Sequence, residues 1–235
     1  MGLTRFLAAT AGELSECKSI AFPIAWMACH FSSSGAGISN LPQTLPRGSL
    51  ILLDDSMPFQ DHDPQKIAEQ LLALSDSLHP KGFILDFQRQ NSEENKTLAK
   101  FLAQTLPCPV AVSDLYAESL SGPVFLSTPP LWAPLKDHIV PWSNREIWLE
   151  AVHTQEVLTL TQDGCHREET IVTDEPLPYK NEQLHCQYDF CLEKDRAVFT
   201  LRRTEQELSS LLHSAESFGI TTAISLYQQT KSSAP

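Results

Sequence analysis

Eight stretches of the chain have the pattern of buried strands. Most are rich in Ile, Val, Leu and Phe and are flanked by Pro, Gly or Ser. Parallel strands that are covered on both faces show such continuous apolar runs. The first stretch, in TRFLAATAGEL, equally fits the start of a helix. The predicted strands are Thr4–Ala9, Ser19–Met27, Ser49–Asp54, Gly82–Phe87, Pro109–Asp114, Pro123–Ser127, Glu146–Val152 and Thr222–Tyr227.

Three amphipathic helices are predicted between these strands. The first begins at Asp63, with Pro64 at its first position, and the second begins at Ser92 with acids in its first turn. In the third, Thr204 and Glu207 form a capping box, and Gly219 ends the helix. Each helix runs into or out of a strand, which is the alternation of a parallel sheet.

Elsewhere the alternation is incomplete. The segments 12–18, 117–122 and 135–144 are too short or too rich in proline for a full helix, and Phe31–Gly48 has the composition of a loop. We therefore predict a TIM-type (β/α)8 barrel that lacks several outer helices, in a single domain over residues 1–235.

Between the seventh and eighth strands the pattern changes to antiparallel hairpins. Glu156–Thr161 and Cys165–Val172 flank an Asp-Gly turn, and Gln187–Leu192 and Ala197–Arg202 flank a second turn. We predict an antiparallel insertion over residues 153–202, carried on the barrel.

The fourth predicted strand lies in the stretch Lys81-Gly-Phe-Ile-Leu-Asp86-Phe-Gln88, which places a carboxylate at the C-terminal end of the strand. In a β/α barrel, the chemistry lies where such strands end. Asp86 and Gln88 are two residues apart, so an extended strand projects both side chains to one side. The alternative is a strand-end Asp that caps the following helix.

Composition excludes several classes of partner. The net charge of −12 argues against nucleic acid or an anionic membrane as the main partner, because both bind basic surfaces. No apolar run has the length of a membrane span, and MGLTRFLAATAGELSE is a poor secretion signal. The 6 cysteines show no framework spacing, so we expect free thiols in a cytoplasmic protein.

With Gly82–Gln88 on the fourth strand and an antiparallel insertion after the seventh, the chain resembles the glycoside hydrolase family 18 barrel, the chitinase-like fold. The final segment, from Tyr188-Asp-Phe through Glu207-Leu to Phe218-Gly-Ile-Thr-Thr-Ala-Ile-Ser-Leu-Tyr, is similar in order to the family's spore-cortex members. The resemblance implies an N-acetylated glycan or a peptidoglycan fragment as partner, and no cofactor.

The family pattern on the fourth strand is Asp-x-x-Asp-x-Asp-x-Glu. Its first two acids fall on Lys81 and Ile84, its third is kept as Asp86, and its catalytic Glu falls on Gln88. The resemblance implies that Asp86 orients the substrate's N-acetyl group. A glutamine amide cannot act as the general acid, and losing acid catalysis typically costs about 10²–10⁴ in rate. The resemblance thus implies an impaired enzyme or one with relocated chemistry.

Four other acids are candidates for relocated chemistry or for ligand binding. Asp54 and Asp55 end the third predicted strand, Asp114 ends the fifth, and Glu150 lies in the seventh. A glycosidase needs two carboxyl groups roughly 5 to 9.5 Å apart. The alternative is that these acids cap loops or helices.

Aromatic side chains are candidate sugar-binding residues, because an aromatic face offers apolar area to the C–H face of a sugar. Trp26 ends the second strand, Trp132 follows the sixth, and Tyr227 takes the place of the family's final-strand Trp. Trp148, in Ile147-Trp-Leu149, fits the core better than a site.

No metal site is predicted. The neighbours Cys29-His30, Cys165-His166 and His185-Cys186 each supply at most one ligand if extended, and zinc requires several that converge. Glycine-rich phosphate loops and catalytic-serine or zinc-protease motifs are also missing from the sequence.

Three hypotheses follow from the sequence. The first is a catalytically impaired, carbohydrate-binding protein on a glycoside hydrolase fold. The second is an active glycoside hydrolase that uses Asp86 with a relocated acid. The third is a cytoplasmic protein-interaction module in which the loop Phe31–Gly48 closes the barrel and the insertion is the working surface.

Overall fold

The computed structural model describes residues 2–17, 22–32, 37–56, 63–89, 92–118, 120–173 and 175–231. Eight parallel strands of these residues form a closed barrel, in the spatial order β1-β14-β8-β7-β6-β5-β4-β2, and β2 pairs with β1 to close it. The barrel strands are β1 (Thr4–Ala9), β2 (Ile24–Phe31), β4 (Leu50–Asp54), β5 (Gly82–Asp86), β6 (Val110–Ser113), β7 (Val124–Leu126), β8 (Ile147–Glu150) and β14 (Thr222–Leu226).

All eight predicted strands are confirmed; the bounds of the second differ most, and those of the others by at most about two residues at an end. The first is a strand and not the start of a helix. The second prediction began at Ser19, but residues 19–21 lie outside the described residues, and β2 continues to Phe31. The predicted loop after it contains a short strand, β3 (Ile38–Ser39), which pairs antiparallel with the end of β2.

The three long helices are α2 (Pro64–Leu78), α3 (Glu93–Thr105) and α6 (Glu205–Ser217). Their predicted caps form: Asp63 accepts from the backbone of Lys66, and Thr204 and Glu207 make the capping box. The other helices of the described residues are short, as the incomplete alternation predicts. They are α1 (Leu14–Cys17), α4 (Asp114–Ala117), α5 (Leu135–Ile139), the 3₁₀ turn η1 (Val140–Trp142) and α7 (Tyr227–Lys231).

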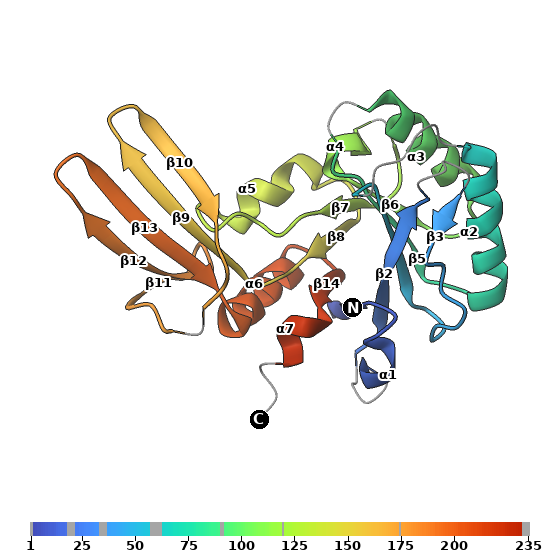
Figure 1. The fold of residues 1–235 in the computed structure, drawn as a ribbon, viewed down its shortest axis with the longest axis horizontal. Coiled ribbons are helices and arrows are strands. Elements are labelled where there is room, and N and C mark those ends of the chain that lie inside the picture. The colour runs from blue at the N-terminus through green and yellow to red at the C-terminus, as the bar shows by residue number, and fades with distance from the viewer. Residues whose placement is uncertain are drawn as a thin grey trace.

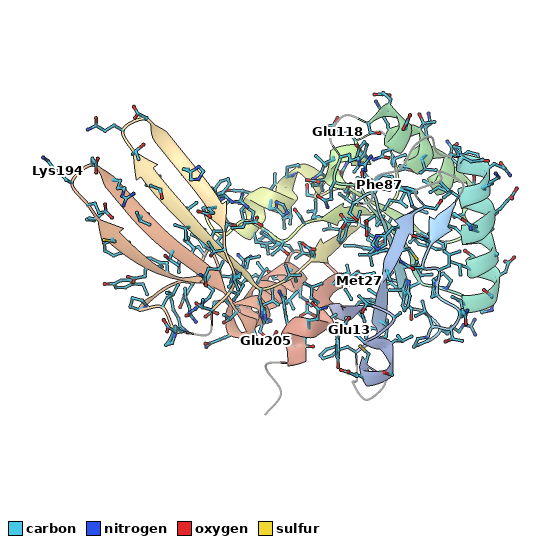
Figure 2. All side chains as sticks on the ribbon, in the orientation of Figure 1. Glu13, Met27, Phe87, Glu118, Lys194 and Glu205 are labelled. Carbon is cyan, nitrogen blue, oxygen red and sulfur yellow. The ribbon has the colours of Figure 1, made fainter. Side chains whose placement is uncertain are left out.

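The predicted insertion is a five-stranded antiparallel sheet, in the order β10-β9-β13-β12-β11. Both predicted hairpins form, and β9 also pairs with β13, so the two hairpins make one sheet. Its strands are β9 (Thr154–Thr161), β10 (Gly164–Glu169), β11 (Tyr179–Asn181), β12 (Cys186–Leu192) and β13 (Arg196–Arg203). The sheet projects from the side of the barrel beyond α5 and α6 (Figure 1), and Lys194 lies at its far tip (Figure 2).

Two apolar layers build the barrel. Its interior is filled by a cluster that includes Phe6, Ile84, Phe125, Trp148 and Ile224. A second layer lies outside the strands, beneath α2 and α3 on one side and beneath α5 and α6 on the other. Because both faces of the strands are buried, most of their residues are apolar.

None of the helices within the described residues has the length and the apolar character that a membrane span requires. All six cysteines have free thiols.

Candidate functional site

The alternation along β5 directs Asp86 into the barrel. Ile84 packs in the interior cluster, so Asp86, two residues later, projects to the same side at the C-terminal end of the strand. The Nε2 atom of Gln88 donates a hydrogen bond of 2.5 Å to Oδ1 of Asp86. The structure thus brings Asp86 and Gln88 together at this end of the barrel, which we call the mouth. The residues that alternate with Ile84, Asp86 and Gln88 pack in the outer layer instead: Phe83, Leu85 and Phe87.

Two further carboxylates surround Asp86. Asp54 is its register partner on the adjacent strand β4, and Glu150 ends β8. Burial raises the pKa of Asp86 to about 6; the negative charges of Glu150 and Asp54 also raise it, and the hydrogen bond from Gln88 opposes them. Strands β8 and β5 are not neighbours in the sheet, so Glu150 acts on Asp86 across the barrel interior. A carboxyl with this pKa gains and loses its proton close to neutral pH, where a general acid works best.

The two flanking acids are held by groups that the sequence did not single out for this role. Nδ1 of His30 lies 2.7 Å from Oδ2 of Asp54, and the backbone N–H and hydroxyl of Ser56 both donate to Oδ1 of Asp54. The backbone N–H and the hydroxyl of Thr128 donate to Oε2 of Glu150, at 3.0 and 2.9 Å. Each acid therefore has a fixed orientation at the mouth.

Asp55 lies beneath the segment that follows β5. Its side chain is 1% exposed and accepts hydrogen bonds from the backbone N–H groups of Gln88 and Arg89 and from Nδ2 of Asn95. The structure thus places Asp55 where it fixes the position of Gln88, and not in the lining of the mouth. Asn95 was not identified from the sequence. Its signal is a polar residue on the buried face of α3, three positions before Leu98.

The remaining candidates lie in different places. Asp114 directly follows β6 and lies at the mouth end of that strand, whereas Trp132, which is 52% exposed, follows Leu131, which packs against Cys186 and Leu201 of the insertion. Trp26 and Tyr227 lie outside the barrel wall. Trp26 is buried in the outer layer with its indole N–H on the Asn40 carbonyl, and the Tyr227 hydroxyl donates to Glu16.

The opposite end of the barrel is packed. Lys81, at the first acid position of the family pattern, lies at this end, and Ile84, at the second, packs in the barrel interior. The Lys81 ammonium donates to the Thr222 hydroxyl and faces the rings of Phe6 and Trp148. Trp148 therefore belongs to the core, as its sequence context predicts.

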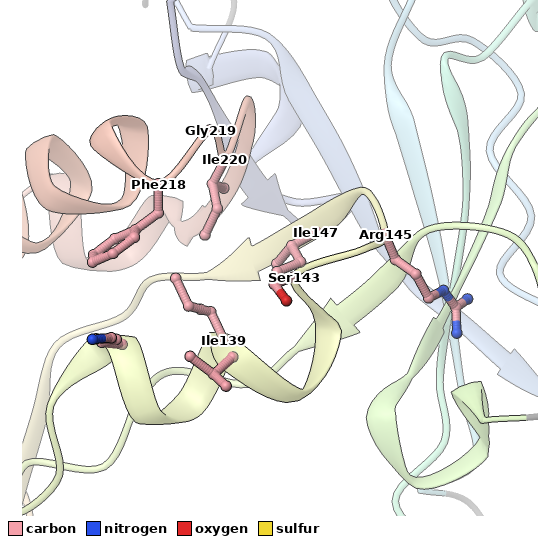
Figure 3. A pocket seen from close by; sticks show the side chains of 9 residues that line it. Ile139, Ser143, Arg145, Ile147, Phe218, Gly219 and Ile220 are labelled. Carbon is pink, nitrogen blue, oxygen red and sulfur yellow. The ribbon is translucent and has the colours of Figure 1, made fainter.

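A pocket of about 260 Å³ also lies at this packed end, on the outside of the barrel (Figure 3). It is bounded by Ile139 and Ser143 on one side and by Phe218 and Ile220 on the other, with Ile147 at the start of β8 between them. It is therefore remote from Asp86. Within the described ranges, no three His, Cys, Asp or Glu side chains are placed to share a metal ion.

Neither the models of known protein families nor the sequences of curated proteins match this chain. The fold, in contrast, has clear counterparts. The structure is similar to the spore cortex-lytic enzyme SleL of Bacillus cereus, with a TM-score of 0.63 and 8% identity, over 95% of this chain and 70% of that one. It is also similar to a chitinase-like agglutinin of Robinia pseudoacacia, with a TM-score of 0.60 and 10% identity, over 95% of each chain.

A third counterpart is a glycoside hydrolase family 18 chitinase of Cycas revoluta in complex with (GlcNAc)3. Its TM-score is 0.54 at 10% identity, over 94% of each chain. Sequence identities this low support a shared fold but not a shared activity. The chain has a β/α-barrel fold that is similar to the fold of these chitinase-like proteins.

Proposed function

We propose that this protein binds an N-acetylated glycan or a peptidoglycan fragment at the mouth and hydrolyses it poorly or not at all. The observation behind the proposal is the pair formed by Asp86 and Gln88, in which an amide donates to the carboxylate at the end of β5. Such an amide holds a polar ligand by hydrogen bonds but has no proton to transfer near neutral pH.

Similar folds support a glycan as the partner. One counterpart is an agglutinin and another holds (GlcNAc)3. The acids Asp54 and Glu150 supply polar groups of the kind that sugar sites use, and the exposed Trp132 belongs to the same loop as Thr128, which holds Glu150. The free thiols agree with a reducing compartment, and we propose a cytoplasmic location on that ground.

The binding test is a calorimetric titration with chito-oligosaccharides and with peptidoglycan fragments. We expect heat from at least one class, and its loss in Asp86→Ala. Asp163→Ala, in an exposed turn of the insertion, is the control and should bind as the natural protein does. If neither class gives heat, the glycan proposal is wrong and the protein-interaction hypothesis replaces it.

The activity test is Gln88→Glu. The new carboxyl has nearly the shape of the amide, and the neighbouring charge of Asp86 raises its pKa and helps to keep it protonated. We expect trace hydrolysis by the natural protein and measurable turnover of activated N-acetylglucosamine substrates by Gln88→Glu. Adding Asp86→Ala should abolish this gain. Gln183→Glu, an exposed change of the same kind in the insertion, should show no gain.

A second candidate function is an active hydrolase with a relocated acid. It is favoured by the raised pKa of Asp86 and by the nearby charge of Glu150, because a glycosidase needs two carboxyl groups at the scissile bond. This alternative requires that the natural protein hydrolyse the same substrates, that Asp86→Asn abolish the activity, and that Gln88→Ala leave it unchanged.

A further inference from the structure

One buried side chain links the insertion to the barrel. Arg203 ends β13 and is 0% exposed. Its Nε and Nη2 atoms donate to the carbonyls of His185 and Leu184, in the loop between β11 and β12, at 3.0 and 2.8 Å. Its Nη1 atom donates at 2.8 Å to the carbonyl of Pro129, in the loop that follows β7. The planar guanidinium thus sets the distance between an insertion loop and a barrel loop.

The barrel loop in turn holds a carboxylate of the mouth. Thr128 precedes Pro129, and its N–H and hydroxyl both donate to Glu150. The Thr128 hydroxyl also accepts from the N–H of Val152, where the chain leaves β8 for the insertion. The position of this loop therefore decides where the charge of Glu150 lies.

We propose that Arg203 is a positioning residue for the mouth: through Pro129 and Thr128 it holds Glu150 within electrostatic reach of Asp86, so that the placement of the insertion controls the charge state of the site. The inference rests on the proposed function only in treating Asp86 as part of a working site.

Titratable groups surround both Asp86 and Arg203. Asp86 is influenced by Glu150 from β8 and by Asp54 and Asp55 from the end of β4. Around Arg203, the nearby titratable groups are His185, Cys186, Glu156 and Glu207. Burial lowers the pKa of Arg203 to about 10, and the buried Glu156 and Glu207, which belong to the insertion and to α6, oppose this shift.

The test is Arg203→Lys, which keeps the charge but loses the rigid fork that serves three carbonyls. The readout is the titration of the Asp86 carboxyl by carbon NMR, without any ligand. If Glu150 moves away, the effect of its negative charge on Asp86 weakens. We therefore expect the pKa of Asp86 to fall by about half a unit or more.

Arg202→Lys is the matched control. Arg202 is 1% exposed and donates to Thr173 and Gln187, which both belong to the insertion. Its replacement should disturb the insertion locally and leave the titration of Asp86 unchanged. Equal shifts in the two variants would overturn the proposal, because they would report a general loosening of the insertion.

A double-mutant cycle separates positioning from mere packing. In a Glu150→Gln background the charge is already gone, so Arg203→Lys should cause no further fall in the pKa of Asp86. A fall of the same size in that background would show that Arg203 does not act through Glu150, and the proposal would be wrong.

Thr128→Val covers the case in which Arg203→Lys fails to fold. It removes one donor to Glu150 and keeps the shape of the side chain, so the pKa of Asp86 should again fall, and only when Glu150 is present. An unchanged titration would contradict the proposal. These titrations need no glycan, so their outcome is independent of the calorimetry that tests the proposed function.

Discussion

The two ends of β5 differ in what the barrel places beside them. At the N-terminal end, a Cβ atom on Gly82 would lie 2.6 Å from both the Pro109 carbonyl oxygen and the Trp148 ring, so only glycine admits this packing. The Lys81 ammonium lies 4.9 Å from the centre of the Phe6 ring and 5.8 Å from that of Trp148. This end is closed by close-packed rings and one cation.

At the C-terminal end, the same strand meets polar groups. Asp86 accepts from the amide of Gln88 and lies in the field of Glu150, and its raised pKa reports that its charge is poorly compensated. Buried charge without full compensation costs stability, and natural proteins retain it chiefly where it has a function. The contrast indicates that the N-terminal end of β5 contributes stability and that its C-terminal end contributes chemistry or binding.

The largest test of this contrast is Trp148→Ala at the packed end. Trp148 is 1% exposed, and deleting a fully buried Trp typically costs about 3–5 kcal/mol of unfolding free energy. Urea denaturation measures this loss. Trp132→Ala is the control, because that residue is 52% exposed and its loss should change stability by less than about 0.5 kcal/mol. Equal losses would mean that the packing around Trp148 contributes no special stability.

The second test is Asp86→Asn at the mouth, where the expected effect has the opposite sign. The folded state keeps a proton on Asp86 up to about pH 6, whereas the unfolded chain releases it near its ordinary pKa of about 4. The folded state therefore binds more protons between these values, and the free energy of unfolding falls as pH rises through this window. Asp86→Asn should escape this fall.

We therefore expect Asp86→Asn to match the natural protein near pH 4 and to exceed it at pH 8, by about 2–3 kcal/mol. Denaturant titrations across this pH range measure the difference. Asp163→Asn, in an exposed turn of the insertion, should follow the natural protein throughout. A variant that is less stable than the natural protein at pH 8 would mean that the Asp86 charge stabilises the fold.

The elements of the barrel were predictable because their signals are local. A continuous apolar run such as Gly82–Leu85 reports a strand covered on both faces, and Asp63 or Thr204 marks the start of a helix wherever the rest of the chain lies. The pairing of β9 with β13 was not predictable in this way. It joins residues about forty positions apart, and alternation within each hairpin does not specify which strands become neighbours.

The candidate site was predictable only in part, for the same reason. The spacing of Asp86 and Gln88 fixes their common side, but a strand that is apolar on both faces does not reveal which face is inside. Trp26 faces outward because Ala25 and Met27 take the interior positions of β2. Thr128 carries no signal at all, since its role depends on a loop that places it against Glu150.

The smallest test returns to the packed end, with Lys81→Met. The change removes a cation facing two rings and a donor to the Thr222 hydroxyl, and it adds apolar area in their place. Cation–π contacts at partly exposed sites contribute about 0.5–1 kcal/mol, so we expect a loss no larger than this in urea denaturation. Lys66→Met, which removes an exposed partner of Asp63 on α2, should have less effect still.

The pH dependence gives this last variant a second readout. Burial lowers the pKa of Lys81, so above that pKa the folded state binds fewer protons than the unfolded chain does. The free energy of unfolding should therefore rise with pH until the unfolded lysine also loses its proton, near its ordinary pKa of about 10.4. Lys81→Met should remove this rise and Lys66→Met should keep it. A rise of the same size in both variants would mean that Lys81 is solvated. The N-terminal end of β5 would then be less tightly closed than its packing indicates.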